Sequence, residues 1–453
     1  MSEPAVRFRT LILAGVVSLL ASCSVTEPEA LGSAFLPVPD DPLVHFLVLV
    51  KTGSAHDPSG KDGLCLMTWE LLVNGGTRTS TAAEVAARLG RLEARISVTV
   101  DKEASAFGAE VSRDNLNAFY AIFRDLLLSP GFRAEDLDLL KADRVLRFEV
   151  PSDEGDVRAF SRAALDRLIY EGHPYGRPSA EAAGTIADIT PVDARVFYAQ
   201  HFVRGNIIVG LAGGYPSDFP DRVLADFKRL PGGFTPPLKL PAPHQPAGPE
   251  VLIAEMPGAG TAVSMGNPLD PGMKPEDAAA LRIAAVDLGQ DPEISLSPDR
   301  FRRQRIFPVP LAVDEGSDPV GAIAASLGSF RAMVDAGIPD DRFELDRKSL
   351  FNEAQRAAGK AGDRLRARAA ALSPAEESED RSRELEILVD MKRTDAGRAA
   401  RKYLDPGRIR IAVVTGDAES ARRVLAAAVQ GANIRVYPAT EIFKPAPRAK
   451  DKE

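Results

Sequence analysis

Two stretches of the chain, about 200 residues apart, carry the same pattern, and this repeat constrains the fold more than any other feature of the sequence. FVRGNIIVGLAGG at residues 202–214 aligns with LDPGRIRIAVVTGD at residues 404–417 when Gly205 is placed on Gly407. The apolar positions of the two runs then coincide, and each run follows a helical segment with an aromatic residue, YAQHF or RKYL. Because the surrounding order of helices and strands also recurs, we predict a duplicated domain.

A stretch rich in proline and glycine, PGGFTPPLKLPAPHQPAGP at residues 231–249, separates the two copies. Such a composition forms neither a helix nor a central strand, so we interpret it as an interdomain linker. The N-terminal domain is then predicted at residues 42–230, the C-terminal domain at 250–440 and a charged tail at 441–453. Buried-strand runs such as LVHFLVLV at 43–50 alternate with helical runs, which favours α+β layers over a doubly wound parallel sheet. We therefore expect two tandem domains, each a mainly antiparallel sheet covered by helices.

The first 22 residues have the pattern of a secretory signal peptide rather than of a folded segment. Two arginines precede a short apolar run, which ends in Leu-Ala-Ser-Cys at Cys23. This ending resembles a bacterial lipobox, which implies cleavage before Cys23 and a lipid on its sulfur; the alternative is an ordinary signal peptide with an incidental cysteine. Ser24 favours the outer membrane, facing the periplasm, over retention at the inner membrane. Residues 23–41 are weakly patterned and are predicted to be a lipidated tether, so the mature chain would lie on a membrane without crossing it.

The residue inventory excludes several kinds of chemistry. With only Cys23 and Cys65 in the chain, a disulfide framework and a cysteine-based zinc cluster are excluded. No two of the five histidines have the spacing of metal ligands on one helix. The net charge of −8 is spread along the chain without a basic stripe, which argues against a nucleic-acid partner. The run AVSMG at 262–266 lacks the first glycine of a hydrolase nucleophile elbow, and no histidine follows His244.

Several stretches occur in the order typical of one family. They are TGSAHDPSGKDGL (52–64), GLCLMTWELLVNGGT (63–77), the strand-like runs within 94–111 and LIYEGHPYGRP (168–178), followed by the repeated turn and strand at 202–214. Together they resemble the M16 metallopeptidases, the group of pitrilysin, insulinase and the mitochondrial processing peptidase. The resemblance covers most of residues 43–230 and extends more weakly over 250–420.

The resemblance implies a degenerate zinc site. Active members carry His-x-x-Glu-His on a helix, in which two histidines bind zinc and the glutamate is the general base. Alignment on the Gly-Leu pair that begins GLCLMTWELLVNGGT places Leu66 at the first histidine, Trp69 at the glutamate and Glu70 at the second histidine. Glu149 is the nearest acid to the position of the third ligand. We therefore expect no bound metal, no zinc cofactor and no peptidase activity; the plainer interpretation of Glu70 is a surface or salt-bridged carboxylate.

Active members also use an arginine and a tyrosine of the second domain to hold the substrate. In FRRQRIFPVPLAV, Arg302 takes the arginine position and Val309 the tyrosine position. Arg302 is thus a candidate substrate-binding residue, and the alternative is a solvated member of a basic cluster.

The sequence therefore predicts an inactive M16-like lipoprotein. By the resemblance, it would pair with a catalytic, zinc-bearing M16 subunit as a heterodimer or larger assembly and help to form a peptide-binding chamber. ARISVTV at 94–100 is the candidate strand for binding an extended peptide by strand addition, or else an ordinary strand of the sheet. Two alternatives stay open: an envelope scaffold or peptide-binding lipoprotein without a peptidase partner, and a divergent active peptidase.

Overall fold

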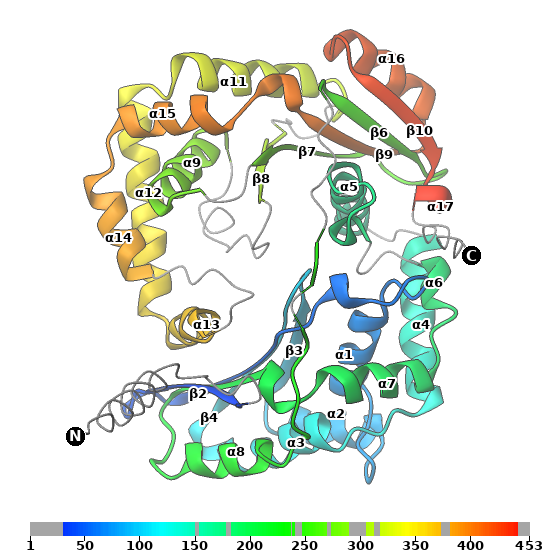
Figure 1. The fold of residues 1–453 in the computed structure, drawn as a ribbon, viewed down its shortest axis with the longest axis vertical. Coiled ribbons are helices and arrows are strands. Elements are labelled where there is room, and N and C mark those ends of the chain that lie inside the picture. Colours follow the sequence, from blue (N-terminus) through cyan, green and yellow to red (C-terminus); the bar gives the residue numbers. More distant parts are fainter. Residues whose placement is uncertain are drawn as a thin grey trace, which may run out of the picture.

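Two five-stranded sheets lie on opposite sides of the molecule, and their helices complete an open ring around them (Figure 1). The structure is a computed structural model that describes residues 30–149, 154–177, 183–236, 238–240, 247–269, 273–289, 305–311, 318–372 and 381–442. The predicted signal peptide, Cys23, Arg302 and the tail beyond residue 442 lie outside the described residues.

The first sheet has the order β1-β5-β2-β4-β3. Its strands are β1 (Gly32–Pro37), β2 (Leu43–Val50), β3 (Arg95–Val100), β4 (Ser105–Ser112) and β5 (Ile207–Gly213). Only the β1–β5 pair is parallel; the other three are antiparallel. The unbroken apolar run of β2 reflects its central place, because both faces of the sheet are covered there, whereas exposure alternates along the edge strand β3.

The second sheet has the order β10-β6-β9-β7-β8. Its strands are β6 (Glu250–Glu255), β7 (Ala262–Leu269), β8 (Arg305–Pro308), β9 (Arg410–Thr415) and β10 (Asn433–Pro438). The pairs β10–β6 and β6–β9 are parallel, and the pairs β9–β7 and β7–β8 are antiparallel. The α+β class is confirmed, but the expectation of a mainly antiparallel sheet holds only for the first sheet.

Four strands of each sheet correspond one to one. The run β1-β5-β2-β4 matches β6-β9-β7-β8 in order and in the direction of every pairing. The repeated glycine turns immediately precede β5 and β9, as the predicted duplication requires. This match also corrects the predicted tether, because residues 32–37 are not a linker but form β1. A short edge strand that ends in proline carries little pattern of its own, so it is recognisable only by its pairing with β5.

One face of each sheet is covered by helices of its own half. The first sheet is covered by α1 (Leu64–Asn74), α3 (Leu116–Leu128), α7 (Pro191–His201) and α8 (Phe219–Phe227), with α2 (Ala82–Arg91), α4 (Ala134–Glu149) and α6 (Ala183–Ile186) outside them. The second is covered by α9 (Pro275–Asp287), α11 (Ile323–Ala336), α12 (Asp340–Gly359), α14 (Arg381–Asp390), α15 (Arg393–Tyr403) and α16 (Ala418–Ala428), with the short α17 (Ala439–Ile442) after β10. The apolar stripe of α3 lies in the first core, as its helical spacing predicted.

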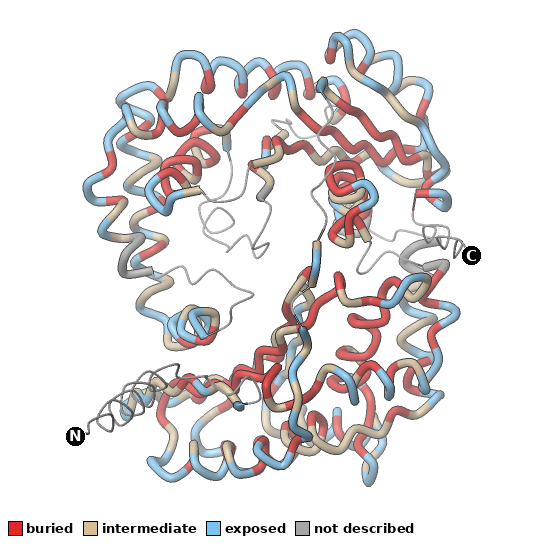
Figure 2. The backbone as a smooth tube through the Cα atoms, in the orientation of Figure 1, coloured by how far each residue is buried: buried red, intermediate tan, exposed pale blue. Residues whose placement is uncertain are grey.

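The opposite face of each sheet is covered by a helix from the other half of the chain. α5 (Glu154–Ile169) packs on β6, β7 and β9 of the second sheet, and α13 (Ala361–Ala371) packs on β1, β2 and β5 of the first. Close approach of α13 requires Gly210 on β5, since a Cβ there would lie 2.8 Å from Cδ1 of Leu365. Figure 2 shows α5 largely buried beside the second sheet. The two halves therefore exchange equivalent helices, and neither sheet is covered on both faces by its own half alone.

Candidate degenerate zinc site

The helix α1 begins and ends at glycines for reasons that are visible in the structure. Gly63, just before the helix, has a φ of 90°, a left-handed conformation that glycine adopts without strain. The carboxyl oxygens of Asp57 accept hydrogen bonds from the backbone N–H groups of Gly63 (2.8 Å) and Cys65 (2.7 Å), which caps the helix. At the other end, a Cβ on Gly75 would lie 2.5 Å from the carbonyl oxygen of Leu71. The frame of GLCLMTWELLVNGGT is thus explained by local backbone geometry.

Trp69, at the position that the resemblance assigns to the general base, is completely buried. Its ring centroid lies 5.9 Å from that of Phe107 on β4, 5.6 Å from that of Phe197 on α7 and 6.0 Å from that of Phe202. These tilted and edge-on arrangements are the favourable ones for aromatic pairs. An indole cannot accept a proton from water as a carboxylate does, and this one fills the interior of the domain.

The two expected ligand positions contain no imidazole. Leu66 is 8% exposed and lies among the buried hydrophobic residues of the domain. Glu70 forms an ion pair with Arg144 of α4, and the Glu70 side chain is only 12% exposed. The interpretation of Glu70 as a salt-bridged carboxylate is confirmed. A carboxylate held by a guanidinium is poorly placed to bind a cation, because the arginine charge repels the metal.

The other predicted residues are not brought into one described site. Glu149 is the last residue of α4, and its side chain lies outside the described residues, as does Arg302. Val309 is 4% exposed and packs in the core of the second domain. Within the described parts of the chain, no group of three or more histidine, cysteine or acidic side chains is arranged to hold a metal ion.

Cys65, beside the first ligand position, has the environment of a buried structural thiol. Burial is the largest cause that raises the pKa of the Cys65 thiol well above its ordinary value, and the nearby Asp57 carboxyl acts in the same direction. Its Sγ lies 3.7 Å from Oγ of Ser105. A thiol in this state is neither a nucleophile nor a metal ligand at neutral pH.

Two histidines far apart in the sequence meet beside α1, and sequence reasoning missed them. The ring centroids of His56 and His201 are 5.7 Å apart, and Nδ1 of His201 lies 2.9 Å from Oγ1 of Thr235. Burial lowers the pKa of each imidazole to about 4, and for His201 the neighbouring His56 adds to the effect. Only the fold brings these residues together, so no spacing rule would have found them.

This pair gives the protein a pH-dependent stability. In the unfolded chain both rings bind a proton near pH 6.5, whereas in the folded chain they resist it until about pH 4. The wild type should therefore lose stability relative to a His56→Gln/His201→Gln variant as the pH falls from 6.5 to 4. The loss is about 3 kcal/mol for His56 and somewhat less for His201, which is closer to solvent.

Chemical unfolding of both proteins at pH 7 and at pH 4.5 measures this difference. The variant is needed as the reference because burial raises the pKa of Asp57 to about 8, which by itself stabilises the fold as the pH falls from 8 toward 4. An unchanged difference in unfolding free energy between the two pH values would contradict the assignment to the histidines.

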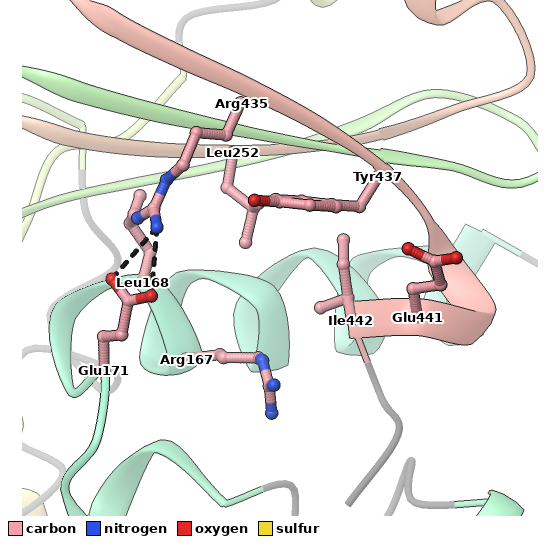
Figure 3. A pocket seen from close by; sticks show the side chains of 8 residues that line it. All are labelled: Arg167, Leu168, Glu171, Leu252, Arg435, Tyr437, Glu441 and Ile442. Carbon is pink, nitrogen blue, oxygen red and sulfur yellow. Dashed lines mark hydrogen bonds and ion pairs between the residues drawn. The ribbon is translucent and has the colours of Figure 1, made fainter. Parts of the chain in front are cut away.

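A cavity lies at the joint between the two halves. It has a volume of about 200 Å³ and is lined by residues of α5, the turn after it, β6, β10 and α17, among them Arg167, Glu171, Arg435 and Tyr437 (Figure 3). Nη1 of Arg435 lies 3.0 Å from both carboxylate oxygens of Glu171. Since its two arginines are balanced by Glu171 and Glu441, the cavity is better explained as the joint that holds α5 on the second sheet.

One part of the chain matches a known family model. Residues 38–180 match the family model described as insulinase (peptidase family M16). The sequence match to the M16 family is confined to this part of the chain, about a third of its length. An uncharacterized zinc protease of Bacillus subtilis, YmxG, is 21% identical over 172 residues, which cover 38% of this chain and 41% of the relative. The match thus spans less than half of the length of either protein.

Solved structures extend the M16 likeness to most of the chain. An inactive M16 peptidase domain from Pseudomonas fluorescens matches 86% of this chain and 96% of its own, with a TM-score of 0.68 and 17% identity. A protease from Helicobacter pylori matches 85% and 97%, with a TM-score of 0.69 and 15% identity. The periplasmic protease PqqL of Escherichia coli matches 89% of this chain and 50% of its own, with a TM-score of 0.61 and 13% identity. The predicted M16 fold is confirmed, and at these identities the likeness concerns the fold alone.

Proposed function

We propose that this protein is a non-catalytic M16-like subunit that pairs with a zinc-bearing M16 peptidase and helps to form its peptide-binding chamber. The observation that carries the proposal is the pair of side chains at the motif positions of α1. Trp69 is buried where the base would act, and Glu70 is tied to Arg144 where a ligand would bind. Zinc sites draw three or four ligands from histidine, cysteine and carboxylate, and these positions supply no free one.

The retained function would be peptide binding at β3. In the described first sheet this strand pairs only with β4, so its other edge is open to an added strand. Figure 1 places β3 at the inner side of the ring. An extended peptide would gain main-chain hydrogen bonds along the six residues of this edge. Without a base or a zinc-bound water nearby, it would be held and released intact.

Lipid attachment at Cys23 and residence in the outer membrane, facing the periplasm, belong to the same proposal and rest on the lipobox resemblance alone. None of the described helices is both long and apolar enough to span a membrane. The alternative function is a peptide-binding or scaffold lipoprotein that works without a peptidase partner.

Affinity purification of the full chain from detergent-solubilised envelopes separates these two functions. We expect a second M16 chain with an intact His-x-x-Glu-His motif to co-purify in a constant ratio. A lipoprotein with the same anchor and an unrelated fold is the control for co-extraction. Recovery of the chain as a clean monomer at its working concentration would contradict the subunit proposal and favour the alternative.

A further inference from the structure

The side chains of β3 that face α13 form a polar surface at the open edge of the first sheet. The register places Leu47 of β2 opposite Gly108 of β4, and Gly108 opposite Ser97 of β3. Leu47 packs against Leu365 of α13, so Gly108 and Ser97 lie on the face of the sheet that α13 covers. Along β3, Arg95, Ser97 and Thr99 are the exposed residues. A peptide added to β3 would therefore have every second side chain on the side of α13.

Arg366 of α13 extends over this surface. Its Nη2 is 3.8 Å from the place that a Cβ on Gly108 would occupy, and Oγ of Ser97 is 3.2 Å from the same place. Because Gly108 has no side chain, the guanidinium lies directly above the backbone of β4 and beside Ser97.

The guanidinium of Arg366 is exposed, and in the described part of the chain no carboxylate lies within ion-pair distance of it. Glu110, one row along the sheet, is held by His45, with 3.2 Å between Nδ1 and the carboxylate. The hydroxyl of Ser97 donates its proton to the carbonyl oxygen of Gly108 at 3.2 Å. Among the described residues, the five N–H donors of Arg366 thus have no carboxylate to receive them.

We propose that the open edge of β3 selects extended peptides with a glutamate at the position opposite Ser97, and that Arg366 recognises its carboxylate. This inference rests on the proposed peptide binding at β3 and names the class of peptide. Neighbouring strands lie about 4.8 Å apart, so the peptide backbone would lie about 10 Å from Gly108. A glutamate reaching back over the small Ser97 side chain spans this gap to the guanidinium, whereas an aspartate is one methylene shorter.

The charge of the peptide residue opposite Ser97 would determine which peptides bind most tightly. A guanidinium binds a carboxylate through two parallel hydrogen bonds, which makes the pair stronger and more directional than a neutral one. A lysine at the same peptide position would meet the like charge of Arg366, with Arg95 one row away on β3. Since α13 belongs to the second half of the chain, the exchanged helix would set the specificity of a strand of the first half.

Fluorescence anisotropy with the full chain tests the proposal. The probes are four labelled peptides with alternating valines that differ only at the central residue, which is glutamate, aspartate, glutamine or lysine. We expect the glutamate peptide to bind about tenfold more tightly than the glutamine peptide, with aspartate between them and lysine weakest. Arg366→Gln should remove the preference for glutamate over glutamine. Arg364→Gln should retain it, because residue 364 lies about 200° around the same helix.

The outcomes separate this inference from the function on which it rests. Equal affinity for the glutamate, glutamine and lysine peptides would overturn the charge selectivity while leaving strand addition in place. A preference that survives in Arg366→Gln would overturn the role of Arg366. If none of the four peptides binds the wild type, both the selectivity and peptide binding at β3 are wrong. Unchanged Trp69 fluorescence in both variants checks that the first domain remains folded.

Discussion

Leu365→Ala on α13 should lower the free energy of unfolding by about 3 kcal/mol, and the loss should appear in the domain at the other end of the chain. Leu365 is 1% exposed and packs against the first sheet, where Leu47, Leu49 and Ile208 surround it. Removing its methyl groups leaves a cavity between the exchanged helix and a rigid sheet. The chain has a single tryptophan, Trp69, which lies in the first domain and reports directly on that domain.

Guanidinium unfolding followed by tryptophan fluorescence measures this effect. Leu372→Ala is the matched control, because Leu372 ends the same helix but is 47% exposed, and it should change stability by less than about 0.5 kcal/mol. If the Trp69 transition stays in place while circular dichroism detects a separate early transition, the helix exchange does not couple the two halves.

Trp69→Glu, which restores the carboxylate of the active motif, should unfold the first domain rather than create a base. The indole is fully buried among Phe107, Phe197 and Phe202, so the change opens a large cavity and buries an unpaired charge. We expect a loss of at least about 4 kcal/mol, which is comparable with the whole stability of many domains.

Thermal unfolding followed by circular dichroism measures this loss, since the variant has no tryptophan. Trp69→Phe keeps the aromatic packing and should cost about half as much or less. Leu139→Glu, on a residue of α4 that is 71% exposed, should change little and controls for the added charge. A stable Trp69→Glu protein would mean that water reaches the position and that the pocket for a base still exists.

The sequence was sufficient to predict the duplication and most of the elements. The repeated turns at Gly205 and Gly407 stand before equivalent strands, and the apolar run from residue 43 is a central strand. These features succeed because a buried strand or an amphipathic helix leaves its periodicity in the sequence. The edge strand β1 was missed, since its six residues show no regular alternation and its partner β5 lies about 175 residues away in the chain.

The helix exchange was also missed, for a physical reason. The pattern of α13 shows that Leu365 and Ala369 share one face, but periodicity does not say which sheet that face will cover.

Only part of the candidate site could be predicted from the sequence. Alignment gave the positions of Leu66, Trp69 and Glu70, whereas the partner of Glu70, Arg144, and the contact between His56 and His201 depend on three-dimensional packing.

The zinc content of the purified chain tests the central claim most directly. The protein would be dialysed against zinc, passed through a desalting column and analysed by mass spectrometry of the metal, with Glu70→Gln as the matched variant. The structure predicts far less than one zinc per chain in both proteins, because Trp69 and the Glu70–Arg144 pair occupy the motif positions. One zinc per chain in the wild type, lost in Glu70→Gln, would contradict this account.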